Sequence, residues 1–171
     1  PGKPLHLIAG KPLIQHVWDR CLECTMLSTV TVATDDERIA AVVEAFGGHV
    51  TMTRSDHPSG TDRAAEVASA FPEVTHIINI QGDEPFIHPG QIDQVIDCFN
   101  NPEAEISTLI KVITEPSELE NRNIPKVVIQ QSGWALYFSR RTIPYCTESE
   151  KIKFLEEGKF YKHIGIYGYR A

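Results

Sequence analysis

The chain has 171 residues, of which 42% are hydrophobic and 23% charged, a size and composition typical of one globular domain with a sizeable core. Its formal net charge of −7 argues against a nucleic-acid partner, because duplex binding needs clustered Lys and Arg. No apolar run approaches the roughly 20 residues that span a bilayer, so we expect a soluble cytoplasmic protein without a membrane partner.

Helices and strands are predicted to alternate along the first hundred residues. Apolar residues at helical spacing predict a helix from Leu13 to Leu22, and the β-branched run after it predicts a strand over 29–34. Asp36 is expected to cap a helix that continues through Ala45. The elements predicted next are a strand over 49–53, a helix over 61–70 capped by Thr61, a strand over 76–81 and a helix over 91–99. This order predicts an α/β fold with a mostly parallel sheet and helices on both faces.

The pattern changes after a predicted strand over 106–112. Strand-like runs at 127–129 and 136–138, separated by a turn, predict a β-hairpin within an insertion subdomain over 113–160. A charged short helix or loop over 148–158 and a last strand over 161–169 follow. We expect one domain over 1–171 that is incomplete at both ends, because an α/β domain rarely starts without a strand or stops directly after one.

Ligands of open α/β sheets bind outside the carboxyl ends of the strands, so residues that follow strands are the first candidates. Gln81-Gly82-Asp83 follows the buried strand over 76–81. Glycine permits close approach of the backbone, and a carboxylate fixed at a strand end suits Mg²⁺, which prefers one or two carboxylates with phosphate oxygens and water. An ordinary surface turn with a capping acid would have the same composition.

Two further clusters have the residue types that bind anions. Ser59, Gly60 and Arg63 lie where a loop opens a helix, so backbone amides and a guanidinium could meet an anion or a nucleobase. A plain N-cap is the alternative. Lys3 could neutralise phosphate, or could be one solvated lysine among 16 Lys and Arg.

A fourth cluster lies late in the chain. Arg140 follows a hairpin strand, and His163 and Tyr167 share one face of the last strand, with Gly165 leaving room between them. Arg140 could bind a carboxylate in a bidentate manner. A histidine and a tyrosine at the edge of a core would give the same pattern.

Cys21 and Cys24 form a C-x-x-C pair at the end of the first predicted helix. A redox pair would favour a helix N-terminus, and a zinc site would need a second close pair, whereas Cys98 and Cys146 are isolated. We therefore expect reduced, semi-buried cysteines.

The order of these motifs resembles the 3-deoxy-D-manno-octulosonate (Kdo) cytidylyltransferase family over essentially the whole chain. The motifs are Pro1-Gly2-Lys3-Pro4-Leu5, Gly10-Lys11-Pro12, Val32-Ala33-Thr34-Asp35-Asp36, Ser59-Gly60-Thr61-Asp62-Arg63, Gln81-Gly82-Asp83-Glu84-Pro85, Lys126-Val127-Val128, Ala135-Leu136-Tyr137-Phe138-Ser139-Arg140, Ile143-Pro144 and His163-Ile164-Gly165-Ile166-Tyr167. Together they are far more specific than any one of them.

The resemblance implies a Rossmann-like nucleotidyltransferase domain of the glycosyltransferase-A-like type, acting as a homodimer. It implies that CTP and Kdo are joined with Mg²⁺, giving CMP-Kdo and pyrophosphate for lipopolysaccharide biosynthesis. The roles that it implies are triphosphate binding for Lys3, metal ligation for Asp83, nucleotide binding for Ser59, Gly60, Arg63 and Gln81, and sugar-acid binding for Gln81, Arg140, His163 and Tyr167.

Some of the family's pattern is absent from this sequence. The phosphate loop expected before Pro1 and the second magnesium aspartate expected after Ala171 are not in it, and the stretch from Asn123 to Lys126 departs from the family's usual approach to its strand. Another sugar acid, such as sialic acid or an amino-Kdo, would use the same chemistry. A nucleotide-binding module without turnover is the alternative from a different class.

Overall fold

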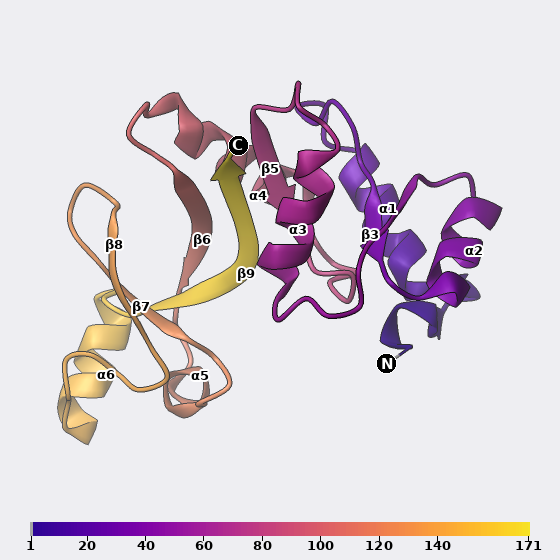
Figure 1. Cartoon of the computed structure of the whole chain (residues 1–171). Helices are drawn as coiled ribbons and strands as arrows, with labels where there is room; N and C mark the ends of the chain where they lie inside the picture. Colours follow the sequence, from indigo (N-terminus) through magenta and orange to yellow (C-terminus); the bar gives the residue numbers. More distant parts are fainter. Residues whose placement is uncertain (1) are drawn as a thin grey trace. The chain divides into compact units, whose positions relative to one another are not determined.

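The computed structural model describes residues 2–171; Pro1, the first residue of the N-terminal motif, lies outside the described residues. The chain divides into two compact units, which are described separately. Unit 1 comprises 1–107 and 166–171, and unit 2 comprises 108–165 (Figure 1). The range 113–160, expected to be an insertion, lies within unit 2.

Unit 1 contains the alternating helices and strands. Its elements are a 3-10 helix Lys3–Leu5, β1 Leu7–Ile8, β2 Lys11–Pro12, α1 Leu13–Leu22, β3 Val32–Thr34, α2 Glu37–Ala45, β4 Val50–Met52, α3 Gly60–Ser69, β5 His76–Asn79, α4 Pro89–Asp97 and a 3-10 helix Cys98–Asn100. The predicted order is confirmed, with strands shorter than expected. Residues 29–31 precede the ladder, which begins where the Val32 amide donates to the His49 carbonyl at 2.8 Å.

The local signals at helix ends explain where these elements begin. The Asp36 side chain accepts from the Arg38 amide and caps α2, as predicted, and Gly47, with φ of 82°, follows its end. The prediction of Thr61 as the cap of α3 is wrong. Ser59 is the cap, because its backbone is extended and its side chain accepts from the Asp62 amide, so α3 begins at Gly60.

Strand pairing in unit 1 is mixed. β3 and β4 are parallel, in the register Val32 opposite Val50. β9 spans Tyr161–Arg170, and its C-terminal part lies antiparallel to β5, with Tyr167 opposite Asn79. The α/β fold is therefore confirmed, while the pairing of β9 departs from the expected parallel arrangement.

The core of unit 1 lies between its helices and strands. Val43 of α2 and Ile92 and Val95 of α4 are fully buried. A Cβ added at Gly168 of β9 would collide with side chains that include Phe99 and Val95, so only glycine permits this packing. Leu22, which belongs to the apolar pattern that predicted α1, is 59% exposed.

Unit 2 has a hairpin and a core of its own. Its elements are most of β6 Ile106–Val112, α5 Pro116–Glu120, β7 Lys126–Ile129, β8 Ala135–Ser139, α6 Glu148–Glu156 and the first part of β9. β7 and β8 form the predicted antiparallel hairpin, with Lys126 opposite Ser139. The buried core residues are Ile113, Leu119, Cys146, Leu155 and Phe160. Because they come from both sides of the hairpin in sequence, they give unit 2 a separate core.

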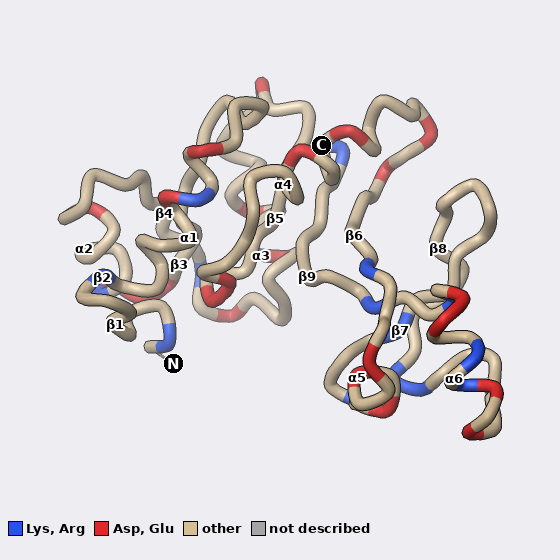
Figure 2. Tube along the Cα trace, turned by 180° about the vertical axis from the view of Figure 1, so that it is seen from behind, with Lys and Arg blue, Asp and Glu red and all other residues tan. Residues whose placement is uncertain are grey.

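Charges of both signs lie along α6 (Figure 2). Lys151 pairs with Glu148 on the same helix and with Glu120 of α5, so it links the two helices. Within residues 2–171, no helix has both the length and the apolar composition needed to cross a bilayer. The cysteines are all free thiols in the structure, and Cys21, Cys24 and Cys146 are buried.

Candidate active site

Lys3 and Asp83, 80 positions apart in sequence, come together in unit 1. The Lys3 Nζ lies 3.6 Å from the Asp83 Oδ2, and the two side chains are 76% and 45% exposed. Lys3 opens a 3-10 helix, and Asp83 lies in the turn after β5, where the Glu84 amide donates to the Gln81 carbonyl. A cation and an anion are thus adjacent and accessible, as required to bind a metal–phosphate group.

The first turn of α3 lies beside Gln81. A Cβ added at Gly60 would lie 3.6 Å from the Gln81 Nε2, in ordinary contact. Ser59 precedes it as the N-cap, and the Thr61 hydroxyl is 3.0 Å from the Tyr169 hydroxyl of β9. Gly60, preceded by its cap Ser59, therefore lies beside the Gln81 amide.

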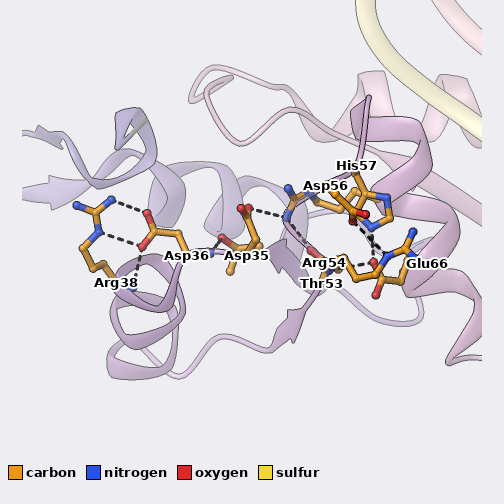
Figure 3. A network of polar contacts seen from close by, with 10 residues as sticks. Asp35, Asp36, Arg38, Thr53, Arg54, Asp56, His57 and Glu66 are labelled. Atoms are coloured by element: carbon orange, nitrogen blue, oxygen red, sulfur yellow. Dashed lines mark hydrogen bonds and ion pairs between the residues drawn. The ribbon is translucent and has the colours of Figure 1, made fainter.

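Arg63 is held by residues that follow two other strands. Its Nη1 lies 2.8 Å from the Asp35 Oδ1, after β3, and donates to the Thr53 Oγ1 at 2.6 Å, after β4 (Figure 3). The Thr53 amide in turn donates to the Thr34 carbonyl. The start of α3 is thereby fixed at the carboxyl ends of β3 and β4.

Asp35 and Thr53 were not among the predicted site residues. Their position immediately after predicted strands was an available signal, because strand ends gather at one edge of a parallel pair. No local pattern indicates that they share Arg63, which lies on a helix later in the chain.

Tyr167 lies in the part of β9 that belongs to unit 1. Its ring stacks on that of Tyr169, with centroids 6.2 Å apart. Burial, and to a smaller extent the neighbouring Tyr169, raise the pKa of the Tyr167 hydroxyl above its usual 10. This hydroxyl therefore stays protonated at neutral pH and can donate a hydrogen bond.

Arg140 and His163 belong to unit 2. The Arg140 Nη1 donates to the Asn123 carbonyl at 2.9 Å and to the Arg122 carbonyl at 3.3 Å. The His163 Nε2 lies 2.7 Å from the Thr108 Oγ1, and its ring meets the Phe138 ring edge to face at 5.4 Å. Burial lowers the pKa of His163 below its usual 6.5, which favours the neutral imidazole.

Lys126 is a residue that the sequence interpretation did not place in the site. It is 3% exposed, and its Nζ donates to the Asn121 carbonyl at 2.6 Å. Burial, followed by the nearby Arg140 charge, lowers its pKa below the usual 10.5. Lys126 and Arg140 therefore bind successive carbonyls of the 121–123 loop; a lysine that opens an apolar strand was the only sequence signal.

The predicted site residues thus fall into two sets. Those in unit 1 are Lys3, Ser59, Gly60, Arg63, Gln81, Asp83 and Tyr167, and those in unit 2 are Arg140 and His163. Within residues 2–171 no group of three or more His, Cys, Asp or Glu side chains is arranged to hold a metal ion. Any ion bound through Asp83 would need oxygens from a ligand or from water.

Comparisons with known proteins identify the family of the chain. The family described as Cytidylyltransferase matches residues 1–171. The 3-deoxy-manno-octulosonate cytidylyltransferases of Thermodesulfovibrio yellowstonii and Bacteroides thetaiotaomicron are each 48% identical to the chain. The alignments cover 100% of the chain and 70% and 69% of those proteins.

A solved structure of CMP:2-keto-3-deoxy-manno-octonic acid synthetase in complex with CTP superposes with a TM-score of 0.90 at 44% identity. The superposition covers 99% of this chain and 68% of the chain of the synthetase. Three findings lead to one assignment: the family match along the whole chain, the identity of nearly one half to the named relatives, and the close structural agreement. The chain belongs to the cytidylyltransferase family, among the 3-deoxy-manno-octulosonate cytidylyltransferases.

Proposed function

We propose that the protein transfers CMP from CTP to the anomeric hydroxyl of Kdo, giving CMP-Kdo and pyrophosphate for lipopolysaccharide biosynthesis. The observation that carries this proposal is the contact of Lys3 with Asp83 beside the Gly60–Gln81 cluster, in a chain of this family. This contact supports the proposal, because Lys3 can bind phosphate, Asp83 can bind a metal ion, and the backbone groups of the cluster can meet a base.

The reaction is an in-line attack of the sugar hydroxyl on the α-phosphorus, with pyrophosphate leaving. Lys3 offsets charge on the triphosphate, and Gln81 orients the nucleotide and the sugar acid. The protein forms no covalent intermediate, so its contribution is positioning and charge stabilisation.

Mg²⁺ is the cofactor that we propose. The donor set fits it, because Asp83 offers one accessible carboxylate and Mg²⁺ normally takes one or two carboxylates with phosphate oxygens and water. When bound, the ion would neutralise charge on the phosphates. Asp83 would hold it, and Lys3 would bind the phosphate oxygens beside it.

On the sugar side, we propose that Arg140, His163 and Tyr167 bind Kdo. Arg140 uses Nη1 for two backbone carbonyls, and a guanidinium has five donors in all, so a fork can still face a carboxylate. Neutral His163 and protonated Tyr167 suit sugar hydroxyls, which both donate and accept hydrogen bonds.

We also propose a cytoplasmic homodimer. Leu136, Tyr137 and Phe138 are 63%, 60% and 44% exposed on β8, the last strand in its sheet order. Exposed apolar side chains on an edge strand suit an interface between protein chains. The cytoplasmic location is supported by CTP, which is an intracellular metabolite.

The test is pyrophosphate release by the full-length protein, supplied with CTP and Kdo, with and without Mg²⁺. We expect turnover only when both substrates and the ion are present. A parallel panel with sialic acid and an amino-Kdo identifies the sugar acid. CTP binding without pyrophosphate release on any sugar acid would contradict the proposal.

A further inference from the structure

The segment between β4 and α3 leads directly into the Ser59–Gly60 turn. It covers residues 53–59, which form neither helix nor strand. Its first contact with α3 is the hydrogen bond from Arg63 to Thr53, and its last is the cap at Ser59. The contacts made by the residues between Thr53 and Ser59 therefore determine where the backbone of Ser59 lies.

One carboxylate of α3 holds the middle of this segment. The Glu66 Oε2 accepts a hydrogen bond from the Arg54 amide at 3.2 Å and is also in contact with the His57 Nε2 (Figure 3). The His57 side chain is 5% exposed and that of Glu66 33%. A nearly buried imidazole on a carboxylate, with a backbone amide on the same oxygen, fixes two points of the loop to the helix.

Charge supports the same arrangement. The contact with His57 is the largest cause that lowers the pKa of Glu66 below its usual 4.5. The hydrogen bond from the Arg54 amide is the next largest cause that lowers it. Arg54 also pairs with Asp56 at 3.4 Å, but those side chains are 70% and 73% exposed. The Arg54–Asp56 pair therefore contributes little, whereas the Glu66 contacts hold the loop.

The position of His57 links these contacts to the nucleotide. It lies two residues before Ser59 and three before Gly60, which packs beside Gln81. Movement of the chain at position 57 would displace the backbone of Ser59 and Gly60 relative to the Gln81 amide. Small displacements matter at such a site, because positioning errors near 1 Å can cost about a hundredfold in rate.

We propose that His57 and Glu66 are positioning residues for the nucleotide, holding the 53–59 segment so that Ser59 and Gly60 present their backbone to the base. This inference rests on the proposed function for the identity of the ligand. Neither side chain needs to touch the ligand; each acts through the loop.

Glu66→Ala removes both contacts and should raise the CTP dissociation constant and the KM for CTP about tenfold, while the KM for Kdo changes less than about twofold. Glu66→Gln keeps an acceptor oxygen and should restore the KM for CTP to within about threefold of wild type. CTP affinity is measured by calorimetry, and KM values are measured by pyrophosphate release in the full-length protein.

Two controls separate positioning from loss of stability. Ala65→Gly, at an exposed site of the same helix, lowers helix stability without touching the loop. Asp56→Asn removes only the exposed ion pair in the loop. Both should retain wild-type KM for CTP.

The inference is overturned if Glu66→Ala keeps wild-type CTP affinity, if it weakens both substrates equally, or if Ala65→Gly weakens CTP as much. Calorimetry keeps this test separate from that of the proposed function. A wild-type protein that binds CTP but does not turn over with Kdo contradicts the function, while the CTP affinities of the variants still decide the role of Glu66.

Discussion

The two units hold their candidate residues in different ways. In unit 1, Lys3 and Asp83 are accessible and contact each other, and the loop beside them is held by separate residues such as Arg63 and Glu66. In unit 2, Arg140 itself binds two backbone carbonyls, beside the buried Lys126. In unit 1, the residues proposed to bind the ligand differ from those that hold the loop, whereas Arg140 is proposed to do both. Substitution of a binding residue should therefore lower activity alone in unit 1, but both activity and stability at Arg140.

Asp83→Asn in the full-length protein should have the largest effect. We expect turnover to be nearly abolished, because an amide cannot supply the anionic oxygen that holds Mg²⁺ against the triphosphate. Stability should change by less than about 0.5 kcal/mol, since Asp83 is exposed. Pyrophosphate release and denaturant unfolding check the two parts. Wild-type rate and magnesium dependence in the variant would leave Asp83 as a turn residue.

Arg140→Ala should act on both binding and support. The KM for Kdo should rise about ten- to a hundredfold or more, since a charge-assisted hydrogen bond is worth roughly 1.5–3 kcal/mol, while the KM for CTP changes little. Unfolding should also become easier, because two carbonyls lose their donor. Arg141→Ala, at the neighbouring exposed arginine, is the matched control.

Truncation of His163 should likewise raise the KM for Kdo. If a variant at Arg140 or His163 raised the KM for CTP as much as the KM for Kdo, the role of that residue would be purely structural.

A pair of glycine substitutions sharpens the comparison. A methyl at Gly60 would lie 3.6 Å from Gln81, and one at Gly165 would meet nothing within 4 Å, so both variants should fold. Gly60→Ala should raise the KM for CTP about three- to tenfold, and Gly165→Ala should raise the KM for Kdo by a similar factor.

The wild-type protein should also prefer CTP to ATP and GTP. Comparable turnover with a purine nucleotide would exclude the loop from base selection.

The smallest expected effect is the pH dependence that His163 brings to stability. Its folded pKa lies below 6.5, so the unfolded chain takes up the proton first as the pH falls. The contribution of His163 to the free energy of unfolding is complete above about pH 6.5. It is lost as the pH falls from there towards the pKa of His163 in the folded protein. Urea unfolding at about pH 7.5 and 5.5 should show a smaller difference between the two values in His163→Gln than in wild type. An identical difference in the two proteins would contradict this.

Local signals predicted most of the fold and part of the site. Hydrophobic spacing located α1, and Asp36 was correctly predicted as the cap of α2. The direction of β9 could not be predicted in this way, because hydrophobic spacing indicates which faces of a strand are buried and not which neighbouring strand it pairs with. The same limit applies to Asp35, Glu66 and Lys126, whose partners are set by tertiary packing.

The contacts of Thr108 with His163 and Ile164 have a consequence for protein engineering. Thr108 is the first residue of unit 2, and its Oγ1 lies 3.3 Å from the Ile164 carbonyl, one residue before the unit ends. The two junctions of the inserted segment are therefore neighbours, which is the arrangement at which whole-domain exchange is tolerated. A transplant of residues 108–165 between members of this family would carry its own hydrophobic core, but both splice points lie inside strands, β6 and β9, so the buried flanking residues Ser107 and Ile166 have to be kept.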